Sequence, residues 1–190
     1  EDQADALVQE LLAQISRIRV GDGLDEKTTM GPLSSKTQLE TVERYVQIGR
    51  DSSAKLLAGG RRLAEDPDRQ GYFYAPTLFD HVSPDSPLAL EEIFGPVLPV
   101  IRVRDFDQAL EVANASRYGL AAALFTTKMK CAQAFMRTIR AGMIHINHGT
   151  ASQAHVPFGG VKDSGLGAYS IGHTAKEFYT NVKAVYVKWE

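Results

Sequence analysis

The chain has 190 residues, of which 44% are hydrophobic and 23% charged, as in an ordinary globular protein with a sizeable core. Its formal net charge of -2 gives no electrostatic basis for binding nucleic acid or an anionic membrane. The longest apolar run, residues 118–125, is far shorter than a membrane span. We therefore expect neither nucleic-acid nor membrane partners. The single cysteine, Cys131, cannot form an internal disulfide, which is typical of a reducing compartment, so we expect a cytoplasmic protein.

The first half of the chain alternates between helical and extended patterns. Apolar residues recur at helical spacing from residue 2 to residue 19, and Gly21-Asp22-Gly23 ends that helix. A second helix carries apolar residues from Leu39 to Ile48, and Ser34 or Ser35 can cap it. The extended segments expected after it are residues 54–58, 72–79 and 97–103, with a surface loop at 67–71.

The second half continues this alternation. Asp105 can cap a helix that begins at Phe106, and Gly142 ends another helix. In chain order the expected elements are a helix at 106–113, a strand at 119–125, a helix at 128–140, a strand at 143–147, a helix at 169–179 and a strand at 182–187. Strands that alternate with helices predict an α/β fold with a mostly parallel sheet and helices on both faces.

The segment Glu91-Glu92-Ile93-Phe94-Gly95-Pro96-Val97 places two acids and an aromatic ring beside a rigid turn. Pro96 fixes its own φ and restricts Gly95, which has no Cβ and leaves room for close backbone approach. A carboxylate here can accept hydrogen bonds from both hydroxyls of a ribose, and a ring can pack against a flat heterocycle. For the Glu-Glu pair alone, a solvated acidic turn is the alternative interpretation.

This motif is followed by three others, at Tyr118–Thr126, Gly142–Asn147 and Pro157–Gly167. The last of them reads Pro-Phe-Gly-Gly-Val-Lys-Asp-Ser-Gly-Leu-Gly. Together the four motifs resemble those of the NAD(P)-dependent aldehyde dehydrogenases, and the matches run from about Gly31 to Val187. Two long motifs in the right order make this resemblance specific.

The resemblance implies an organisation in three parts. Residues 1–168 would be the C-terminal part of the aldehyde dehydrogenase catalytic domain, 169–181 a C-terminal helix and connection, and 182–190 an oligomerisation strand. This last strand has no obvious partner within its own chain, and exposed strand edges favour pairing with a second chain. We therefore expect a homodimer or homotetramer assembled through residues 182–188. An ordinary edge strand of the main sheet is the alternative.

The resemblance also implies a reaction and a cofactor. The family uses NAD or NADP to oxidise a small-molecule aldehyde to the carboxylic acid through a cysteine thiohemiacetal. Glu92 matches the family glutamate that holds the ribose next to the nicotinamide, and Phe94 matches the residue that packs near the nicotinamide ring. Gln38 falls where the family lines the cofactor cleft, and Glu91 is expected to face solvent. The alternatives are that Glu92 caps the turn and that Phe94 is a core residue.

Three further residues fall where the family lines its substrate tunnel. Phe158 matches the tunnel aromatic close to the nucleophile, with a core role as its alternative. Asn147 ends a strand, as the matching family asparagine does, and its side chain would link loops around the active site. His155 belongs to the loop 148–155 that would shape the tunnel. This chemistry needs no metal, and we expect none.

The chain lacks the residues that perform the family's covalent chemistry. The nucleophilic cysteine belongs to a Gly-Gln-x-Cys-like motif that is absent here, as is the glutamate base upstream of it. Cys131 lies in a helical pattern without a Gly-rich turn or a nearby histidine, which favours a structural or exposed thiol. We therefore expect a fragment of the enzyme that is inactive alone. A non-catalytic structural or interaction module that keeps the fold is the alternative.

The chain departs from the common family pattern after Gly167. Many members continue with Arg-Glu, whereas Ala168-Tyr169 stands here. The runs His155–Gly160 and Glu177–Thr180 look more like the semialdehyde-oxidising branches of the family. These differences argue against a generic aliphatic aldehyde without establishing another substrate. Both NAD and NADP stay open, because the resemblance places the residues that read the adenosine ribose outside this chain.

Overall fold

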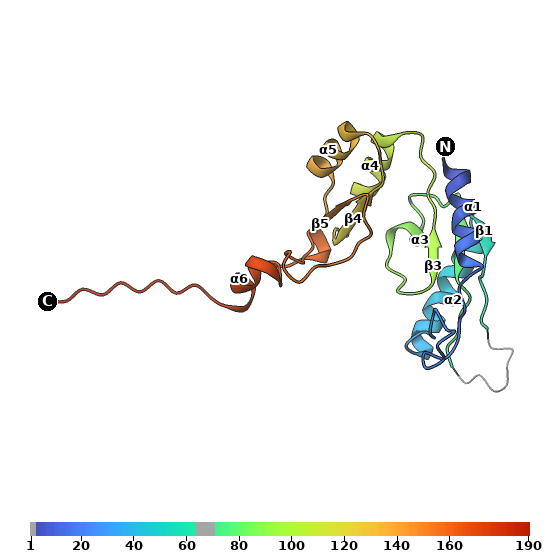
Figure 1. The fold of residues 1–190 in the computed structure, drawn as a ribbon, viewed down its shortest axis with the longest axis horizontal. Coiled ribbons are helices and arrows are strands. Elements are labelled where there is room, and N and C mark those ends of the chain that lie inside the picture. The colour runs from blue at the N-terminus through green and yellow to red at the C-terminus, as the bar shows by residue number, and fades with distance from the viewer. Residues whose placement is uncertain (1–2, 64–70) are drawn as a thin grey trace. The chain divides into compact units, whose positions relative to one another are not determined.

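The computed structural model describes residues 3–63 and 71–190 and divides the chain into two compact units (Figure 1). The N-terminal unit is Glu1–Asp105 and the C-terminal unit is Phe106–Glu190. The boundary falls inside the range 1–168 that the sequence assigned to one part of a domain. Both units combine helices with strands, so the predicted α/β class is confirmed.

The N-terminal unit builds a small mixed sheet. Its elements are α1 (Ala4–Ile15), α2 (Lys36–Arg50), β1 (Lys55–Ala58), β2 (Thr77–Asp80), α3 (Pro87–Leu90) and β3 (Val97–Pro99). The strands lie in the order β1-β2-β3, with β1 antiparallel to β2 and β2 parallel to β3. Thr77 lies opposite Val97, so β2 fixes the position at which the chain enters β3. The strand ends at Pro99, which has no N–H to donate.

Helix α2 carries much of the core of this unit on one face. The Ser35 hydroxyl accepts a hydrogen bond from the Gln38 amide at 3.1 Å, so Ser35 is the cap of the two that the sequence offered. Gly49 lies so close to the Phe79 ring that an added Cβ would come within 2.5 Å of it. The core cluster comprises Leu39, Val42, Tyr45, Val46, Tyr74, Phe79, Val82, Leu88 and Ile93.

The C-terminal unit contains one strand–helix–strand motif, β4-α5-β5. Its elements are α4 (Phe106–Ala115), β4 (Ala121–Leu124), α5 (Met129–Thr138), β5 (Met143–Ile146), two short 3-10 helices η1 (Lys162–Ser164) and η2 (Gly172–Thr174), and α6 (Ala175–Tyr179). β4 and β5 pair in parallel, with Ala121 opposite Met143, and α5 makes the connection that parallel strands require. The described strands thus form two separate sheets in place of the single sheet expected, and two of their three pairings are parallel.

Several predicted boundaries were wrong for local reasons. The first helix ends at Ile15, short of residue 19. β2 begins only at Thr77, because Pro76 before it cannot donate a ladder hydrogen bond. The helix expected at 169–179 is reduced to α6 and a short 3-10 turn, since Gly172 adopts a φ of 69° that interrupts an α-helix.

Helix α3 was not predicted, although the sequence carries a signal for it. The Ser86 hydroxyl accepts a hydrogen bond from the Leu88 amide at 3.2 Å, and Pro87 occupies the first helical position. The loop expected at 67–71 lies almost entirely outside the described residues. Within the described part of the chain, no helix is both long enough and apolar enough to cross a membrane.

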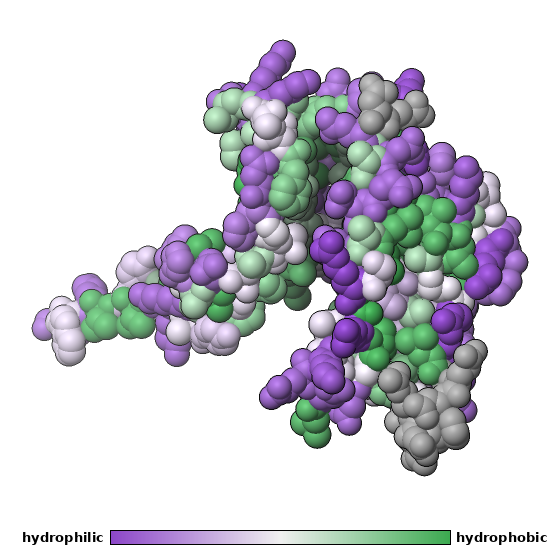
Figure 2. All heavy atoms as spheres, turned by 45° about the vertical axis from the view of Figure 1, so that its right-hand side comes forward, coloured by the Kyte–Doolittle hydropathy of each residue, from purple (hydrophilic) through white to green (hydrophobic). Residues whose placement is uncertain are grey.

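The segment after α6 forms no strand in this single chain and runs as an extended trace (Figure 1). Its apolar side chains lie open to solvent, and Figure 2 shows hydrophobic residues in green along part of the arm that projects to the left. The exposed residues are Val182, Val185, Tyr186, Val187 and Trp189. The pairing of residues 182–188 with a second chain stays a prediction.

A buried carboxylate at the end of β2 connects three parts of the N-terminal unit. Arg102 donates to the two oxygens of Asp80 at 3.0 and 2.7 Å, and the His81 amide donates at 2.7 Å. The same guanidinium reaches Asp5 of α1 at 2.7 Å. The hydrogen bonds from Arg102, followed by the bond from the His81 amide, hold the pKa of Asp80 below its ordinary value.

Asp80→Asn should lower the apparent Tm of the complete protein by roughly 5 °C or more at pH 7, because it leaves the Arg102 guanidinium without its buried anion. Since the folded-state pKa of Asp80 lies below its unfolded value of about 3.9, the pair stabilises the protein above that pH. This stabilisation is lost as the pH falls through the folded pKa. The Tm difference should therefore be constant down to about pH 5 and shrink below about pH 4.

Thermal unfolding followed by circular dichroism checks this prediction. The exposed residue Asp85 provides the control, because Asp85→Asn makes the same chemical change in the same unit without a buried partner. Equal Tm shifts in the two variants would contradict a stabilising role for the Asp80–Arg102 pair.

Candidate functional site

The turn at residues 91–96 joins α3 to β3 and is held against α2. The Gln38 side-chain nitrogen donates to the backbone carbonyls of Ile93 at 2.6 Å and Phe94 at 2.9 Å. Phe94 has a φ of 51°, in a left-handed region that costs a residue other than glycine about 1–2 kcal/mol. Because both bonds act at this position, Gln38 stabilises the strained conformation of the turn.

A second contact from α2 fixes the start of the turn. The hydroxyl of Tyr45, a residue that is 3% exposed, donates a hydrogen bond to the Glu91 carboxylate. This hydrogen bond, and then burial, raise the pKa of the Tyr45 phenol, so the hydroxyl remains protonated and donating. Glu91 is exposed, as expected, but its carboxylate has a partner that the sequence analysis missed. The sequence did contain a signal for this contact: Tyr45 lies two helical turns after Gln38, so both residues face the turn from the same side of α2.

Between these two contacts the turn packs directly onto α2. A Cβ added to Gly95 would come within 2.3 Å of the Val42 side chain, which is fully buried. The close backbone approach expected at Gly95 is therefore confirmed, and only glycine fits there without a shift of the core.

Glu92 and Phe94 are the two exposed side chains of the turn that can bind a ligand. The Glu92 carboxylate has no hydrogen bond or ion pair with any residue that the structure describes. Phe94 is 77% exposed, so it is not a core residue of the N-terminal unit. An acceptor-only carboxylate and an open ring two residues apart can together bind sugar hydroxyls and a flat ring.

In the C-terminal unit, Asn147 continues the pairing of β4 with β5 beyond the ends of the strands. Its side-chain oxygen accepts from the Thr126 amide at 2.8 Å, and its side-chain nitrogen donates to the Thr126 carbonyl at 2.9 Å. Its own amide donates to the Leu124 carbonyl at 2.9 Å. These bonds hold Asn147 at a φ of 51° and link the loops that follow the two strands.

Phe158 lines a cavity of about 180 Å³ that is formed largely by the glycine-rich segment after it. The aromatic rings of Tyr169 and Phe178 line the same cavity. Gly159 lies against the Tyr169 ring, where an added Cβ would come within 2.3 Å of a ring atom. His155 is exposed and does not line this cavity.

The glycine-rich segment is fixed to the rest of the unit around Gly119. The Gly119 amide donates to the Ser164 hydroxyl at 3.1 Å, and the Gly119 carbonyl accepts from the Val161 amide at 2.9 Å. Lys162 has a φ of 54°, and its ammonium group donates to the Asn114 carbonyl at 3.0 Å in the last turn of α4. A cation at this end of a helix interacts favourably with the helix dipole. These contacts set the path of the chain just after Phe158.

Three further side chains that could bind a metal or act as a nucleophile, those of Cys131, His145 and His148, lie in the C-terminal unit. Cys131 is a free, partly buried thiol within α5, in agreement with the helical pattern around it. The rings of His145 and His148 stack with their centroids 5.6 Å apart. Among the residues that the structure describes, no group of three His, Cys, Asp or Glu could hold a metal ion.

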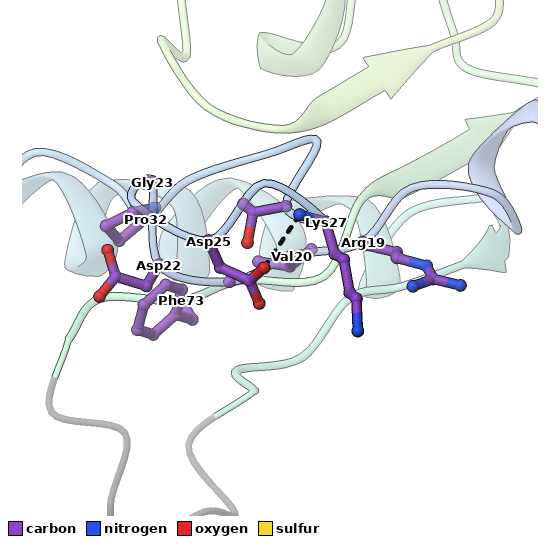
Figure 3. A pocket seen from close by; sticks show the side chains of 10 residues that line it. Arg19, Val20, Asp22, Gly23, Asp25, Lys27, Pro32 and Phe73 are labelled. Carbon is purple, nitrogen blue, oxygen red and sulfur yellow. Dashed lines mark hydrogen bonds between the residues drawn. The ribbon is translucent and has the colours of Figure 1, made fainter.

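A larger cavity, of about 790 Å³, lies in the N-terminal unit and includes none of the predicted site residues (Figure 3). Its charged groups are two acids, Asp22 and Asp25, and two bases, Arg19 and Lys27. Each acid accepts a hydrogen bond from a backbone amide two residues later, at 3.0 and 2.9 Å. The acids therefore shape their own loop, and their charges are balanced by the bases.

The sequence predicted three cofactor-binding residues and three tunnel residues, and the structure brings the cofactor-binding residues together. Gln38 contacts the turn that carries Glu92 and Phe94, so the three cofactor residues form one local arrangement. The three tunnel residues all lie in the C-terminal unit, where Asn147 follows β5 and Phe158 lines the smaller cavity. Their assignment to a substrate tunnel stays a prediction.

Comparison with known proteins gives consistent matches along the chain. The sequence model described as the aldehyde dehydrogenase family matches residues 1–185. The chain is 38% identical over 181 residues to alpha-ketoglutaric semialdehyde dehydrogenase of Bacillus subtilis (strain 168), covering 95% of this chain and 37% of that protein. It is 39% identical over 191 residues to malonate-semialdehyde dehydrogenase 3 of Geobacillus kaustophilus (strain HTA426), covering 100% of this chain and 39% of that protein.

The fold agrees with these matches. The crystal structure of an NAD-dependent aldehyde dehydrogenase from Sinorhizobium meliloti is similar with a TM-score of 0.91 at 39% identity, covering 98% of this chain and 36% of that chain. The chain thus spans 36–39% of the length of these three relatives. Since the family model covers nearly every residue and the fold matches as well, the chain belongs to the aldehyde dehydrogenase family.

Proposed function

We propose that this chain supplies the nicotinamide-ribose side of the cofactor site, and part of the substrate tunnel, of an NAD(P)-dependent aldehyde dehydrogenase. The observation that carries the proposal is the turn at 91–96, which presents a free carboxylate and an exposed ring within a chain of this family. Because the chain spans little more than a third of its relatives, the activity belongs to the complete protein that contains it.

The side chains of the turn fit the nicotinamide half of the cofactor. Glu92 has two acceptor oxygens and no competing partner among the described residues, which suits the two hydroxyls of a ribose. Phe94 offers a ring face for packing beside the nicotinamide. When bound, the cofactor would accept a hydride from the aldehyde carbon. Gln38 would act by holding the turn, because its side-chain nitrogen is already engaged by two carbonyls.

The C-terminal unit would contribute to the passage of the aldehyde. Phe158 would form an apolar wall of the tunnel, and Asn147 would fix the loops at its end. His155 would contribute from its exposed loop. The covalent step is assigned to a cysteine elsewhere in the complete protein, because the only cysteine of this chain, Cys131, lies within α5.

A semialdehyde is the substrate class that the relatives favour. Two of them are named for α-ketoglutaric and malonate semialdehydes, whose carboxylate distinguishes them from simple aliphatic aldehydes. The His155–Gly160 and Glu177–Thr180 runs pointed to the same branches. We place the protein in the cytoplasm, where a chain with a single cysteine needs no disulfide.

The complete protein should reduce NAD or NADP in the presence of malonate semialdehyde, as followed by absorbance at 340 nm. Its kcat/KM should be at least about tenfold higher than with propanal, which has the same carbon count without the carboxylate, because charged-group recognition discriminates strongly. The assay with each cofactor separately decides between NAD and NADP. A complete protein that binds neither cofactor would support the non-catalytic module instead.

Glu92→Ala in the complete protein should raise the Kd for the cofactor about tenfold or more, because it removes charge-assisted hydrogen bonds to the ribose. Isothermal titration calorimetry measures this Kd without turnover. Glu10→Ala, on the exposed face of α1, is the control and should leave the Kd unchanged. Equal affinities for the two variants would remove Glu92 from the cofactor site.

We also propose that the complete protein forms a homodimer or homotetramer through residues 182–188. The side chains of Val185 and Tyr186 are 73% and 96% exposed on an extended segment. Such a segment has unpaired backbone groups that can form a β-ladder with a second chain. The amides of neighbouring strand residues point to opposite edges, so proline at one of these two positions must remove a pairing hydrogen bond.

Val185→Pro or Tyr186→Pro should therefore shift the complete protein to a smaller species in size-exclusion chromatography with light scattering. Val185→Thr, which keeps both the amide and a β-branched side chain, should retain the oligomer. An unchanged molar mass in both proline variants would exclude this strand from the interface.

A further inference from the structure

We propose that Tyr45 is a positioning residue for the cofactor, acting through its hydrogen bond to Glu91 to set the direction of Glu92. This inference rests on the proposed function of the 91–96 turn. It assigns a role to two residues, Tyr45 and Glu91, that the sequence analysis did not place in the site.

The first observation is a stripe of contacts along α2. Gln38, Val42 and Tyr45 are spaced by four and three residues, so they share one face of the helix. Gln38 binds the carbonyls of residues 93 and 94, Val42 packs under Gly95, and Tyr45 binds the side chain of Glu91. Glu92 has no hydrogen bond or ion pair with this stripe or with any other described residue.

The second observation is the alternation of burial along the turn. Glu91 has extended backbone angles, φ -113° and ψ 153°, and its side chain reaches toward α2. Ile93 is buried, with 8% of its surface exposed, and Glu92 between them is exposed. In extended backbone, successive side chains point to opposite sides, so fixing Glu91 and Ile93 on the α2 side directs Glu92 away from it.

The third observation concerns the strength of the contact. A neutral donor to a carboxylate makes a charge-assisted hydrogen bond. Tyr45 is 3% exposed, so its ring is fixed in the core, and the bond reaches from there to the exposed Glu91. The Arg44 guanidinium lies over the face of the Tyr45 ring, 4.6 Å from its centre, in a cation–π contact. The Glu91 amide donates to the Pro87 carbonyl at 3.0 Å, which fixes the backbone. No other donor in the described part of the chain binds the Glu91 carboxylate, so the direction of this side chain depends on Tyr45.

Tyr45→Phe in the complete protein should raise the Kd and KM for the nicotinamide cofactor about fivefold or more, while kcat at saturating cofactor stays within about twofold. The removed hydroxyl touches no ligand, so the loss comes from a less well directed Glu92. Tyr72→Phe is the matched control, since the Tyr72 ring is 38% exposed and no described residue hydrogen-bonds its hydroxyl. A Tyr45→Phe protein with a lowered Tm and unchanged cofactor affinity would overturn the inference.

A double-mutant cycle tests whether Tyr45 and Glu91 affect cofactor affinity through the hydrogen bond between them. Glu91→Gln keeps a neutral acceptor for the phenol and should lose less cofactor affinity than Glu91→Ala, which should reproduce Tyr45→Phe. Because both changes remove the same hydrogen bond, the Tyr45→Phe/Glu91→Ala double variant should be no weaker than either single variant. Losses that multiply in the double variant would show that the two residues act independently.

Hydrogen–deuterium exchange gives a readout that needs no cofactor. Amides of residues 92–97 should exchange faster in Tyr45→Phe than in Tyr72→Phe, with the rest of the protein unchanged. Equal exchange in this segment would overturn the positioning role. If the complete parent protein binds no nicotinamide cofactor, the proposed function fails, and faster exchange would still establish that Tyr45 holds the turn.

Discussion

The packing of one face of α2 against the turn at 91–96 is the contact on which the proposed cofactor site depends. Helical spacing places an amide, an aliphatic side chain and a phenol in line, at Gln38, Val42 and Tyr45. Each fixes a different residue of the turn, and Glu92 is left free. Helix α2 therefore holds residues 91–95 of the turn in place, and the pairing of β3 with β2 fixes the C-terminal end of the turn.

Left-handed backbone conformations that are stabilised by side-chain hydrogen bonds occur in both units. Phe94, Asn147 and Lys162 all adopt left-handed backbone angles that are unfavourable for residues with a Cβ. At each of them, hydrogen bonds between side chains and backbone groups stabilise the conformation. Two of these residues, Phe94 and Asn147, were singled out from the motifs alone. Strain of this kind concentrates at functional sites, because a ligand needs groups that regular structure does not present.

Local signals predicted the elements that carry the turn. Ser35 caps α2 as its hydroxyl chemistry indicates, and Gly95 permits the close approach expected of it. Local signals did not reveal the division between Asp105 and Phe106, because contacts across long sequence separations decide which segments pack together. The partner of Glu91 was missed for the same reason, since Tyr45 lies 46 residues earlier in the chain.

The sequence by itself determined the family, the α/β class and the two acids and ring of the 91–97 motif, because these depend on residue type and spacing along the chain. Only the tertiary structure decided which acid is engaged and which is free. Glu91 and Glu92 are identical in chemistry and adjacent in sequence. They differ because the Glu91 side chain reaches the Tyr45 hydroxyl of α2, whereas Glu92 has no hydrogen bond or ion pair with a described residue.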